Sequence, residues 1–164
     1  VGLHTGGSWG VAVSPAGTTN ASGGLIGLHT GFNFQSGSFV YGLEADVGHT
    51  WNQTPIIAGV VNGGIDWHGS IRARLGYAMD RTLIYATGGV AFARAYANVI
   101  PVPALSATYG FTGWTLGAGL EHAFTKNLTA RVEYRYSDFG SQATLLGTTS
   151  LRESRATLGI SYKF

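Results

Sequence analysis

The sequence predicts an all-β fold: an eight-stranded antiparallel up-and-down β-barrel that spans a membrane as one domain over residues 1–164. Three observations support this prediction. Only 11% of the residues are charged, against about 25% in soluble domains, yet no run of about 18 apolar residues could form a transmembrane helix. Apolar and polar residues instead alternate with a period of two in eight segments. The connections between these segments alternate between short and long, which is typical of outer-membrane barrels.

The alternation places apolar residues on one face of each segment, and mostly glycine, threonine and charged residues on the other. It is clearest in the last segment, where Leu158 and Ile160 alternate with Gly159 and Ser161. His122 is a polar exception on an apolar face. Each segment is near or above the roughly 9–11 residues that a tilted strand needs to cross a bilayer. The predicted strands are residues 1–13, 23–35, 39–48, 67–77, 82–95, 114–124, 128–136 and 155–164.

The connections between the predicted strands differ in length in a regular way. Short turns are expected near residues 36–38, 79–82 and 125–127, and long loops near 14–23, 52–65, 97–110 and 138–152. This pattern predicts periplasmic turns, four extracellular loops, and both termini on the periplasmic side. Loops 52–65 and 97–110 are largely apolar. Either they contact other envelope or surface proteins or a lipid, or they extend the strands and pack on one another.

Periodicity alone does not decide which face is the lumen, because a soluble eight-stranded barrel such as a lipocalin has its apolar face inside. The residue types favour a polar lumen. Arginine and carboxylate residues are interleaved with glycine and threonine, which suits a narrow interior where long side chains need room. The predicted lumen charge network consists of Glu44, Asp46, Arg72, Arg74, Glu121, Arg131, Glu133, Arg135, Arg155 and Lys163.

Opposite charges also meet across the predicted strand pairs, as a closed lumen requires of buried charges. The last short turn places Glu121 opposite Arg131. A symmetric closure of the second long loop predicts two more pairs: Glu44 with Arg74, and Asp46 with Arg72.

Aromatic residues gather at both ends of the predicted strands, as they do in the girdles of membrane barrels. The tryptophans lie within a few residues of long loops, whereas several phenylalanines and tyrosines lie near short turns or the C-terminus. The predicted girdle residues are Trp9, Trp51, Trp67, Trp114, Phe34, Phe39, Tyr77, Phe124, Tyr162 and Phe164.

Four segments resemble a known family. Residues 133–140, EYRYSDFG, resemble the penultimate strand of small porin-like outer-membrane proteins of Gram-negative bacteria, the OmpA-like/opacity superfamily that includes the outer-membrane immunogenic proteins. Residues 69–77 and 83–91 resemble its central strands. The last segment is similar to the C-terminal insertion signal of such barrels, through Leu158, Ile160, Tyr162 and Phe164.

The resemblance implies an abundant surface-exposed protein of the cell envelope. Its expected contacts are outer-membrane lipids, lipopolysaccharide, and the barrel-assembly machinery during biogenesis. The expected roles are structural support and surface interaction; the alternative is a porin-like channel for small solutes. Because an eight-stranded barrel is just wide enough for side chains to fill, we expect a filled polar lumen rather than a wide pore.

The candidate chemistry is weak, and we predict no catalytic residue, no cofactor and no metal. Some eight-stranded outer-membrane barrels modify lipid A, but His49 at the expected rim has no nearby serine on its face. His4, His29 and His68 point inward and could bind Zn or Cu. The predicted pairing places His29 opposite Ser8, which favours lumen hydrogen bonding instead.

The compartment follows from the same features. The chain lacks cysteine, which permits an oxidising compartment, and it begins at Val1 without a basic-plus-apolar leader. We therefore expect a bacterial outer-membrane protein whose signal peptide has been removed. No basic cluster indicates nucleic-acid binding. A soluble ligand-binding barrel remains the rival interpretation of the fold.

Overall fold

The computed structural model describes residues 1–15, 17–51, 54–57, 61–99, 106–144 and 147–164. Among these residues, no helix is long and apolar enough to cross a bilayer. The strands are β1 (Gly2–Ser14), β2 (Gly17–Ser36), β3 (Phe39–Trp51), β4 (Thr54–Ile57), β5 (Val61–Met79), β6 (Thr82–Val99), β7 (Ser106–Ala123), β8 (Leu128–Thr144) and β9 (Gly147–Tyr162).

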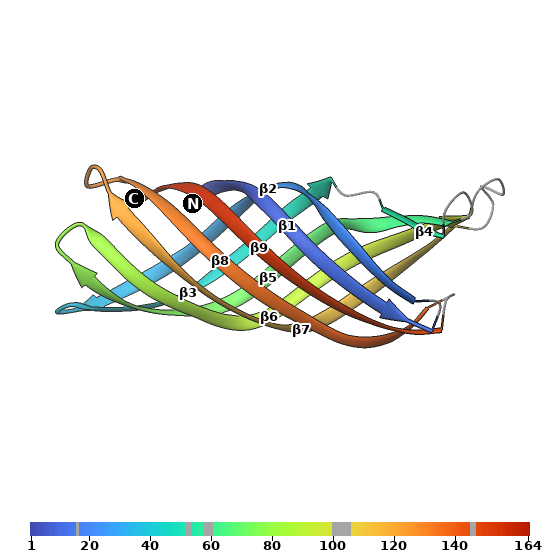
Figure 1. Cartoon of the computed structure of the whole chain (residues 1–164). Helices are drawn as coiled ribbons and strands as arrows, with labels where there is room; N and C mark the ends of the chain where they lie inside the picture. Colours follow the sequence, from blue (N-terminus) through green and yellow to red (C-terminus); the bar gives the residue numbers. More distant parts are fainter. Residues whose placement is uncertain (16, 52–53, 58–60, 100–105, 145–146) are drawn as a thin grey trace.

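The strands form one closed antiparallel barrel. The sheet has the order β3-β2-β1-β9-β8-β7-β6-β5-β4, and a pairing between β3 and β5 closes the ring. Strand β4 pairs with β5 but lies outside the ring, so eight of the nine strands make up the wall (Figure 1). The predicted eight-stranded up-and-down barrel is therefore confirmed. Closure leaves no strand edge within the wall, which satisfies the backbone groups of the ring.

The two ends of the barrel differ. The turns after β2, β5 and β7 and both chain termini lie at one end, which we call the turn end (Figure 1). We call the opposite end, where β4 lies, the hairpin end. The tight turns place Gly37 and Asp80 at positive φ angles of 60° and 51°; glycine suits such a position because it has no Cβ. All three predicted short turns are confirmed.

The four long loops were predicted to be longer than they are. At the hairpin end β1 continues to Ser14 and β2 begins at Gly17, while β8 ends at Thr144 and β9 begins at Gly147. These extensions are rich in Ser and Thr, so they lack the apolar alternation that marked the strands. The side chains of residues 52–64 and 97–107 lie outside the described part, and the expected partner surface on these two apolar segments stays a prediction.

One of the two predicted registers is correct. Glu121 is opposite Arg131, because the short β7–β8 turn allows only one alignment. The β3–β5 register is wrong by two residues, since Glu44 is opposite Arg72 and Asp46 is opposite Ser70. The alignment shifts along the connection, since Ile57 is opposite Val61, Thr54 is opposite Gly63 and His49 is opposite Trp67. These two one-residue shifts account for the difference.

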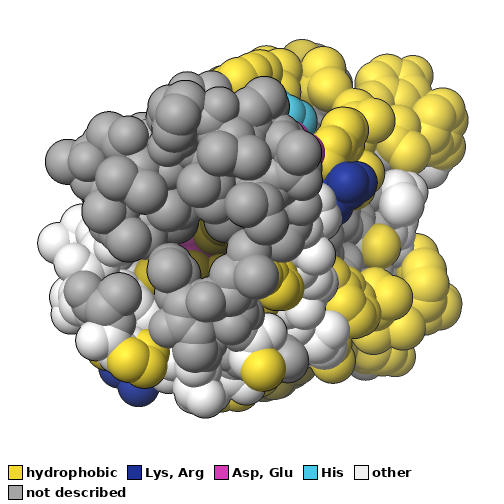
Figure 2. All heavy atoms as spheres, turned by 90° about the vertical axis from the view of Figure 1, so that its right-hand side faces the viewer, with side chains coloured by type: hydrophobic (Ala, Val, Ile, Leu, Met, Phe, Trp, Pro, Cys, Tyr) yellow, Lys and Arg dark blue, Asp and Glu magenta, His cyan; other side chains and the backbone are white. Residues whose placement is uncertain are grey.

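The facing of the wall is as predicted. Large apolar side chains are exposed on the exterior of every wall strand, and the charged residues are buried inside. Hydrophobic side chains cover much of the exterior that is visible from the hairpin end (Figure 2). The interior is not entirely polar: near the hairpin end, six buried apolar residues form a cluster that the alternation did not predict. They are Ile65, Ala91, Ala93, Phe111, Phe139 and Leu151.

Candidate functional site

The barrel interior buries five carboxylates and five guanidiniums in the part of the chain that the structure describes. Nine of the ten predicted network residues are among them. Lys163 lies beyond the end of β9 with a half-exposed side chain, 3.5 Å from Glu121. Glu153 was missed, although it continues the polar face two residues before Arg155. It falls between the predicted loop 138–152 and the predicted strand 155–164, whereas β9 already begins at Gly147.

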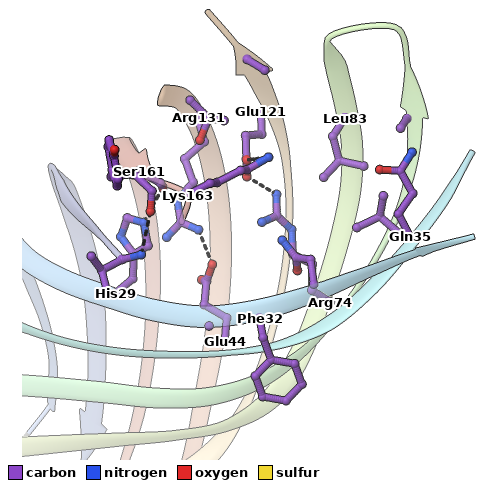
Figure 3. Close-up of a pocket in the computed structure, with 18 of the residues that line it drawn as sticks. His29, Phe32, Gln35, Glu44, Arg74, Leu83, Glu121, Arg131, Ser161 and Lys163 are labelled. Atoms are coloured by element: carbon purple, nitrogen blue, oxygen red, sulfur yellow. Dashed lines mark hydrogen bonds and ion pairs between the residues drawn. The ribbon is translucent and has the colours of Figure 1, made fainter. Parts of the chain in front are cut away.

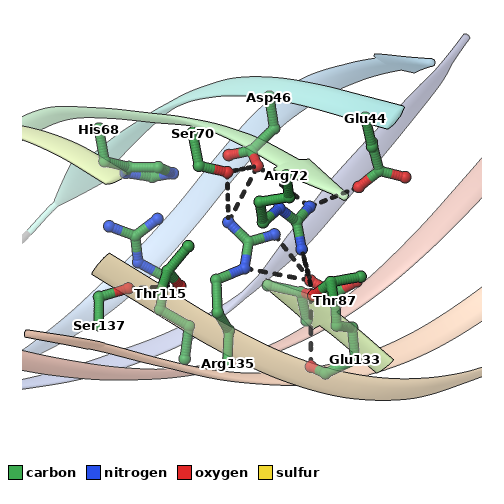
Figure 4. A network of polar contacts seen from close by, with 12 residues as sticks. Glu44, Asp46, His68, Ser70, Arg72, Thr87, Thr115, Glu133, Arg135 and Ser137 are labelled. Carbon is green, nitrogen blue, oxygen red and sulfur yellow. Dashed lines mark hydrogen bonds and ion pairs between the residues drawn. The ribbon is translucent and has the colours of Figure 1, made fainter. Parts of the chain in front are cut away.

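Arg72 is the centre of the network. Its guanidinium contacts Glu44, lies 3.1 Å from Asp46 and 2.8 Å from Glu133, and donates a hydrogen bond to Thr87. The side chain of Arg72 is completely buried. These contacts link β5 to β3 on one side and reach across the lumen to β8 (Figure 4). The arginine therefore ties together strands that are not neighbours in the wall.

Arg135 repeats this bridging from the opposite wall. It lies 2.9 Å from Asp46 and 2.7 Å from Glu133, so both carboxylates are shared with Arg72 (Figure 4). The Tyr85 hydroxyl also donates to Glu133 at 2.9 Å. A buried charge network is stable only when its members are paired and hydrogen-bonded. In this network the pairing crosses the lumen from wall to wall.

The remaining ion pairs lie on either side of Arg72 along the barrel axis, one toward the turn end and one toward the hairpin end. Arg74 lies 2.5 Å from Glu121, and Arg155 lies 2.5 Å from Glu153. Glu121 and Arg131 are opposite each other on β7 and β8, but they do not form an ion pair. Arg131 instead reaches across the lumen to Glu44. In a barrel this narrow, a side chain can meet the far wall as easily as its neighbouring strand.

A vestibule opens at the turn end. Its volume is about 530 Å³, and its lining includes Lys163, Arg74, Glu121 and, at its inner end, Glu44 and Arg131. The close-up shows Arg131 directed toward Glu44, and Arg74 and Lys163 directed toward Glu121 (Figure 3). The vestibule thus leads from the turn end to the charge network and is lined by both signs of charge.

The three inward histidines are buried as predicted, but the pairing predicted for one of them is wrong. His29 is opposite Gly2, whereas Ser8 is opposite Gly23. The error arose because β2 begins at Gly17, six residues before its predicted start, while β1 ends only one residue beyond its predicted end. This asymmetry moves the whole alignment. His29 and His4 are consequently close, with ring centroids 5.7 Å apart.

The hydrogen bonds of these histidines are incomplete. His29 Nε2 lies 2.8 Å from the Ser161 hydroxyl, and His68 Nδ1 lies 3.0 Å from the Thr50 hydroxyl. Among the described residues, His4 Nδ1, His29 Nδ1 and His68 Nε2 are buried and have no hydrogen-bond partner. The expected lumen hydrogen bonding therefore accounts for only part of their polar surface.

The exterior carries the aromatic residues that were predicted to form girdles. All ten are exposed on the outside of the barrel or at its C-terminus, and several contact one another, such as Phe39 with Tyr77 at the turn end. At the other end of the strands, His49 lies between Trp51 and Trp67, with both ring centroids at 5.3 Å.

His49 also has a partner that the sequence did not reveal. Its Nε2 lies 2.8 Å from a carboxylate oxygen of Asp66, a residue located at an irregularity of the β5–β6 pairing. Its other ring nitrogen has no hydrogen-bond partner among the described residues. Without a hydroxyl nucleophile at that nitrogen, the pair lacks the arrangement of a serine hydrolase.

A second cavity lies near the hairpin end. This groove has a volume of about 440 Å³ and is lined by residues of β1, β8 and β9, among them Trp9, Val11, Tyr136 and Arg152. Arg152 is exposed and lies 3.1 Å from Asp138. The groove therefore combines apolar walls with a cation at its margin.

Comparison with known proteins agrees with this geometry. A family model described as the outer membrane protein beta-barrel domain matches residues 1–164. The chain belongs to this outer-membrane β-barrel family. Within it, the 25 kDa outer-membrane immunogenic protein of Brucella abortus is 36% identical, over 99% of this chain and 76% of its own length. The 22 kDa outer membrane protein of Rhizobium leguminosarum is 33% identical, over 99% of this chain and 77% of its own.

Solved structures of family-like barrels show the same fold. The attachment invasion locus protein Ail of Yersinia pestis superposes with a TM-score of 0.62 at 15% identity, covering 99% of this chain and 97% of that one. Neisserial surface protein A superposes with a TM-score of 0.63 at 13% identity, covering 99% and 96%. The family model and the outer-membrane relatives of Brucella and Rhizobium place the protein in the bacterial outer membrane, and they confirm the resemblance found in the sequence.

Proposed function

We propose that this outer-membrane β-barrel is a structural and surface protein whose lumen is closed by its own side chains. Its exterior anchors it in the lipid, its charge network holds the barrel in shape, and its hairpin end faces the outside of the cell. The ion pairs that cross the lumen from Arg72 and Arg135 carry this proposal. They occupy the space through which a solute would have to pass.

A second barrier supports the same conclusion. The apolar cluster that includes Ile65, Phe111, Phe139 and Leu151 is buried near the hairpin end, and its members come from strands around most of the ring. Ions and polar solutes lose hydration in such a constriction and gain no hydrogen bond in return. A solute from the turn end would therefore meet the charge network first and then this cluster.

The orientation follows the usual arrangement of outer-membrane barrels, with short turns in the periplasm and longer hairpins outside. The hairpins extend beyond the exposed apolar band, so they are the part available to lipopolysaccharide and to other surface proteins. The outer groove favours a lipid contact there. Its apolar walls suit an acyl chain, and Arg152 at its margin suits a phosphate group.

A porin-like channel for small solutes is the second candidate, and the vestibule favours it. This cavity of about 530 Å³ is open at the turn end and lined by charges of both signs. It ends at Glu44 and Arg131, however, where the buried ion pairs begin. A modification of lipid A has less support, because His49 has an acidic partner but no hydroxyl nucleophile among the described residues.

Single-channel recording separates the two candidates. Purified protein is refolded, inserted into planar lipid bilayers, and its insertion is verified by heat-modifiable gel mobility of the same preparation. We expect bilayers that stay silent under an applied potential. Discrete, reproducible conductance steps in proportion to the inserted protein would instead establish the channel. The matched variant Glu133→Ala removes a carboxylate shared by two arginines, and we expect it to be leakier than the wild type.

A further inference from the structure

Two histidines of the lumen face each other across two glycines in one row of the barrel wall. His4 of β1 is opposite Gly27 of β2. Gly27 is in turn opposite Gly48 of β3, and Gly48 is opposite His68 of β5. The row therefore has imidazoles on its outer strands and no side chain on the two strands between them.

The glycines provide the space into which the imidazoles lean. A Cβ atom at Gly27 would lie 2.6 Å from His4 Nε2. A Cβ atom at Gly48 would overlap His68 Nε2. Real side chains do not tolerate such approaches, so both rings depend on glycine at these positions to reach over the β2–β3 pair.

Asp46 completes the group. It lies on β3 two residues before Gly48, on the same face of the strand. His4, Asp46 and His68 each offer one ligand atom, and these atoms all lie within 4.8 Å of one another. The three residues are only 4%, 7% and 3% exposed.

Each member of this group has an unused polar atom. Within the described part of the chain, His4 Nδ1, His68 Nε2 and Asp46 Oδ2 are buried without a hydrogen-bond partner. The two oxygens of the Asp46 carboxylate differ, because Oδ1 accepts hydrogen bonds from Ser70 and Arg135. Leaving buried polar atoms unpaired costs free energy, so a ligand that binds these three residues would be stabilised at this place.

We propose that His4, Asp46 and His68 form a binding site for a divalent transition-metal ion, with Zn²⁺ as the ion that the ligands suit best. Two imidazole nitrogens and one carboxylate oxygen are a common ligand set for zinc, with the fourth position open to water. Calcium and magnesium prefer oxygen ligands. Because zinc binds each ligand at about 2.0–2.2 Å, its ligands lie roughly 3.4 Å apart, so ligand atoms that lie within 4.8 Å of one another need to approach by up to about 1.4 Å.

The surroundings determine how tight the site is. Asp46 is shared with Arg72 and Arg135, and a cation must compete with both guanidiniums for the carboxylate. We therefore expect weaker binding than at a dedicated structural zinc site. The ion would join β1, β3 and β5 directly, which adds a cross-link between strands that the arginine network connects only in part.

The vestibule at the turn end approaches the site. His29 lines the vestibule, and its ring centroid lies 5.7 Å from that of His4. An ion that enters the vestibule thus meets one histidine before it reaches the first ligand of the site. This order of residues places the site beyond the inner end of the cavity.

Isothermal titration calorimetry with ZnCl₂ tests the proposal on untagged protein that has been refolded in detergent and treated with EDTA. We expect one Zn²⁺ per chain. His68→Gln and His4→Gln keep a polar side chain but remove one imidazole, and each should weaken binding at least tenfold. His122→Gln is the matched control, because His122 is exposed, forms a hydrogen bond with Thr82 and packs against Phe124, away from the lumen.

Gly48→Ala provides an independent variant, since it retains all three ligands and displaces the His68 ring; it should also weaken binding at least tenfold. Folding of every variant is checked by its heat-modifiable gel mobility, and only folded variants are titrated. Absence of zinc binding by the wild type would overturn the proposal. Unchanged affinity in folded His68→Gln and His4→Gln, or an equal loss in His122→Gln, would overturn it too.

Discussion

Leu158 tests the assignment of the exterior to lipid. Its side chain is 64% exposed, and its neighbours across the strands are Thr5 of β1 and Val132 of β8. It lies four residues before Tyr162 of the turn-end girdle. At about 3.3 Å per residue in a strand tilted by about 40°, this is about 10 Å from the girdle. The apolar band of such barrels is about 25 Å tall, so Leu158 lies near its middle.

An arginine near the midplane of a barrel's lipid face costs about 2–4 kcal/mol, and the cost falls to about 0–1 kcal/mol near the interface. We therefore expect Leu158→Arg to lower the free energy of unfolding by about 2–4 kcal/mol. Ile160→Arg, two residues closer to the girdle, should have a smaller effect. The assay is urea-induced unfolding in phosphatidylcholine vesicles, followed by tryptophan fluorescence.

Ser36→Arg serves as the control, because Ser36 is exposed at the end of β2 beside a tight turn and the added charge stays in water. It should change the free energy of unfolding by less than about 0.5 kcal/mol. If Leu158→Arg unfolds at the same urea concentration as the wild type, the side chain does not face lipid and the reasoning fails.

Three further predictions concern the interior, the wall and assembly. Arg72→Met leaves three buried carboxylates without their shared cation and should cost about 3–5 kcal/mol in the same unfolding assay, whereas Arg152→Met at the exposed pair should cost less than about 1 kcal/mol. Gly42→Ala brings a Cβ atom into a backbone carbonyl of β2 and should cost about 1–3 kcal/mol; Gly110→Ala, which meets nothing within 4 Å, should be neutral. Phe164→Ala should slow assembly into outer membranes in a reconstituted assay while leaving the unfolding of the folded barrel unchanged, since Phe164 is 97% exposed.

The wall of the barrel could be predicted from the sequence because each feature depends on neighbouring residues. Alternation with a period of two identifies a strand and its two faces without knowledge of the partner strand. The Glu121–Arg131 register was accessible for the same reason, since a short turn defines the pairing of its two strands. Outside the apolar band the alternation weakens, and the predicted last strand therefore begins at Arg155 and omits Glu153, which lies on β9.

The arrangement inside the lumen depends on pairings between distant segments, which the sequence does not specify. The β3–β5 register could not be derived because the alignment shifts by one residue twice between the tip of the connection and the wall. The row that joins His4 to His68 passes through three strand pairings. The wrong β1–β2 alignment therefore placed His4 and His29 apart in the prediction, although their rings lie close together in the structure. Contacts across the lumen, such as Arg131 with Glu44, have no signal in local sequence at all.

The closed lumen is the central claim, and cysteine accessibility tests it most directly. The chain has no cysteine, so Thr115→Cys introduces a single thiol at a lumen position that is 1% exposed and hydrogen-bonded to Ser137 at 2.9 Å. The folded variant in vesicles is treated with a small charged thiol reagent on both sides, with Ser36→Cys as the exposed control and the boiled protein as the reactive reference. We expect Thr115→Cys to stay unmodified until the protein is boiled, while Ser36→Cys reacts at once. Modification of the folded Thr115→Cys barrel at a rate near that of Ser36→Cys would show a water-filled passage and contradict the account.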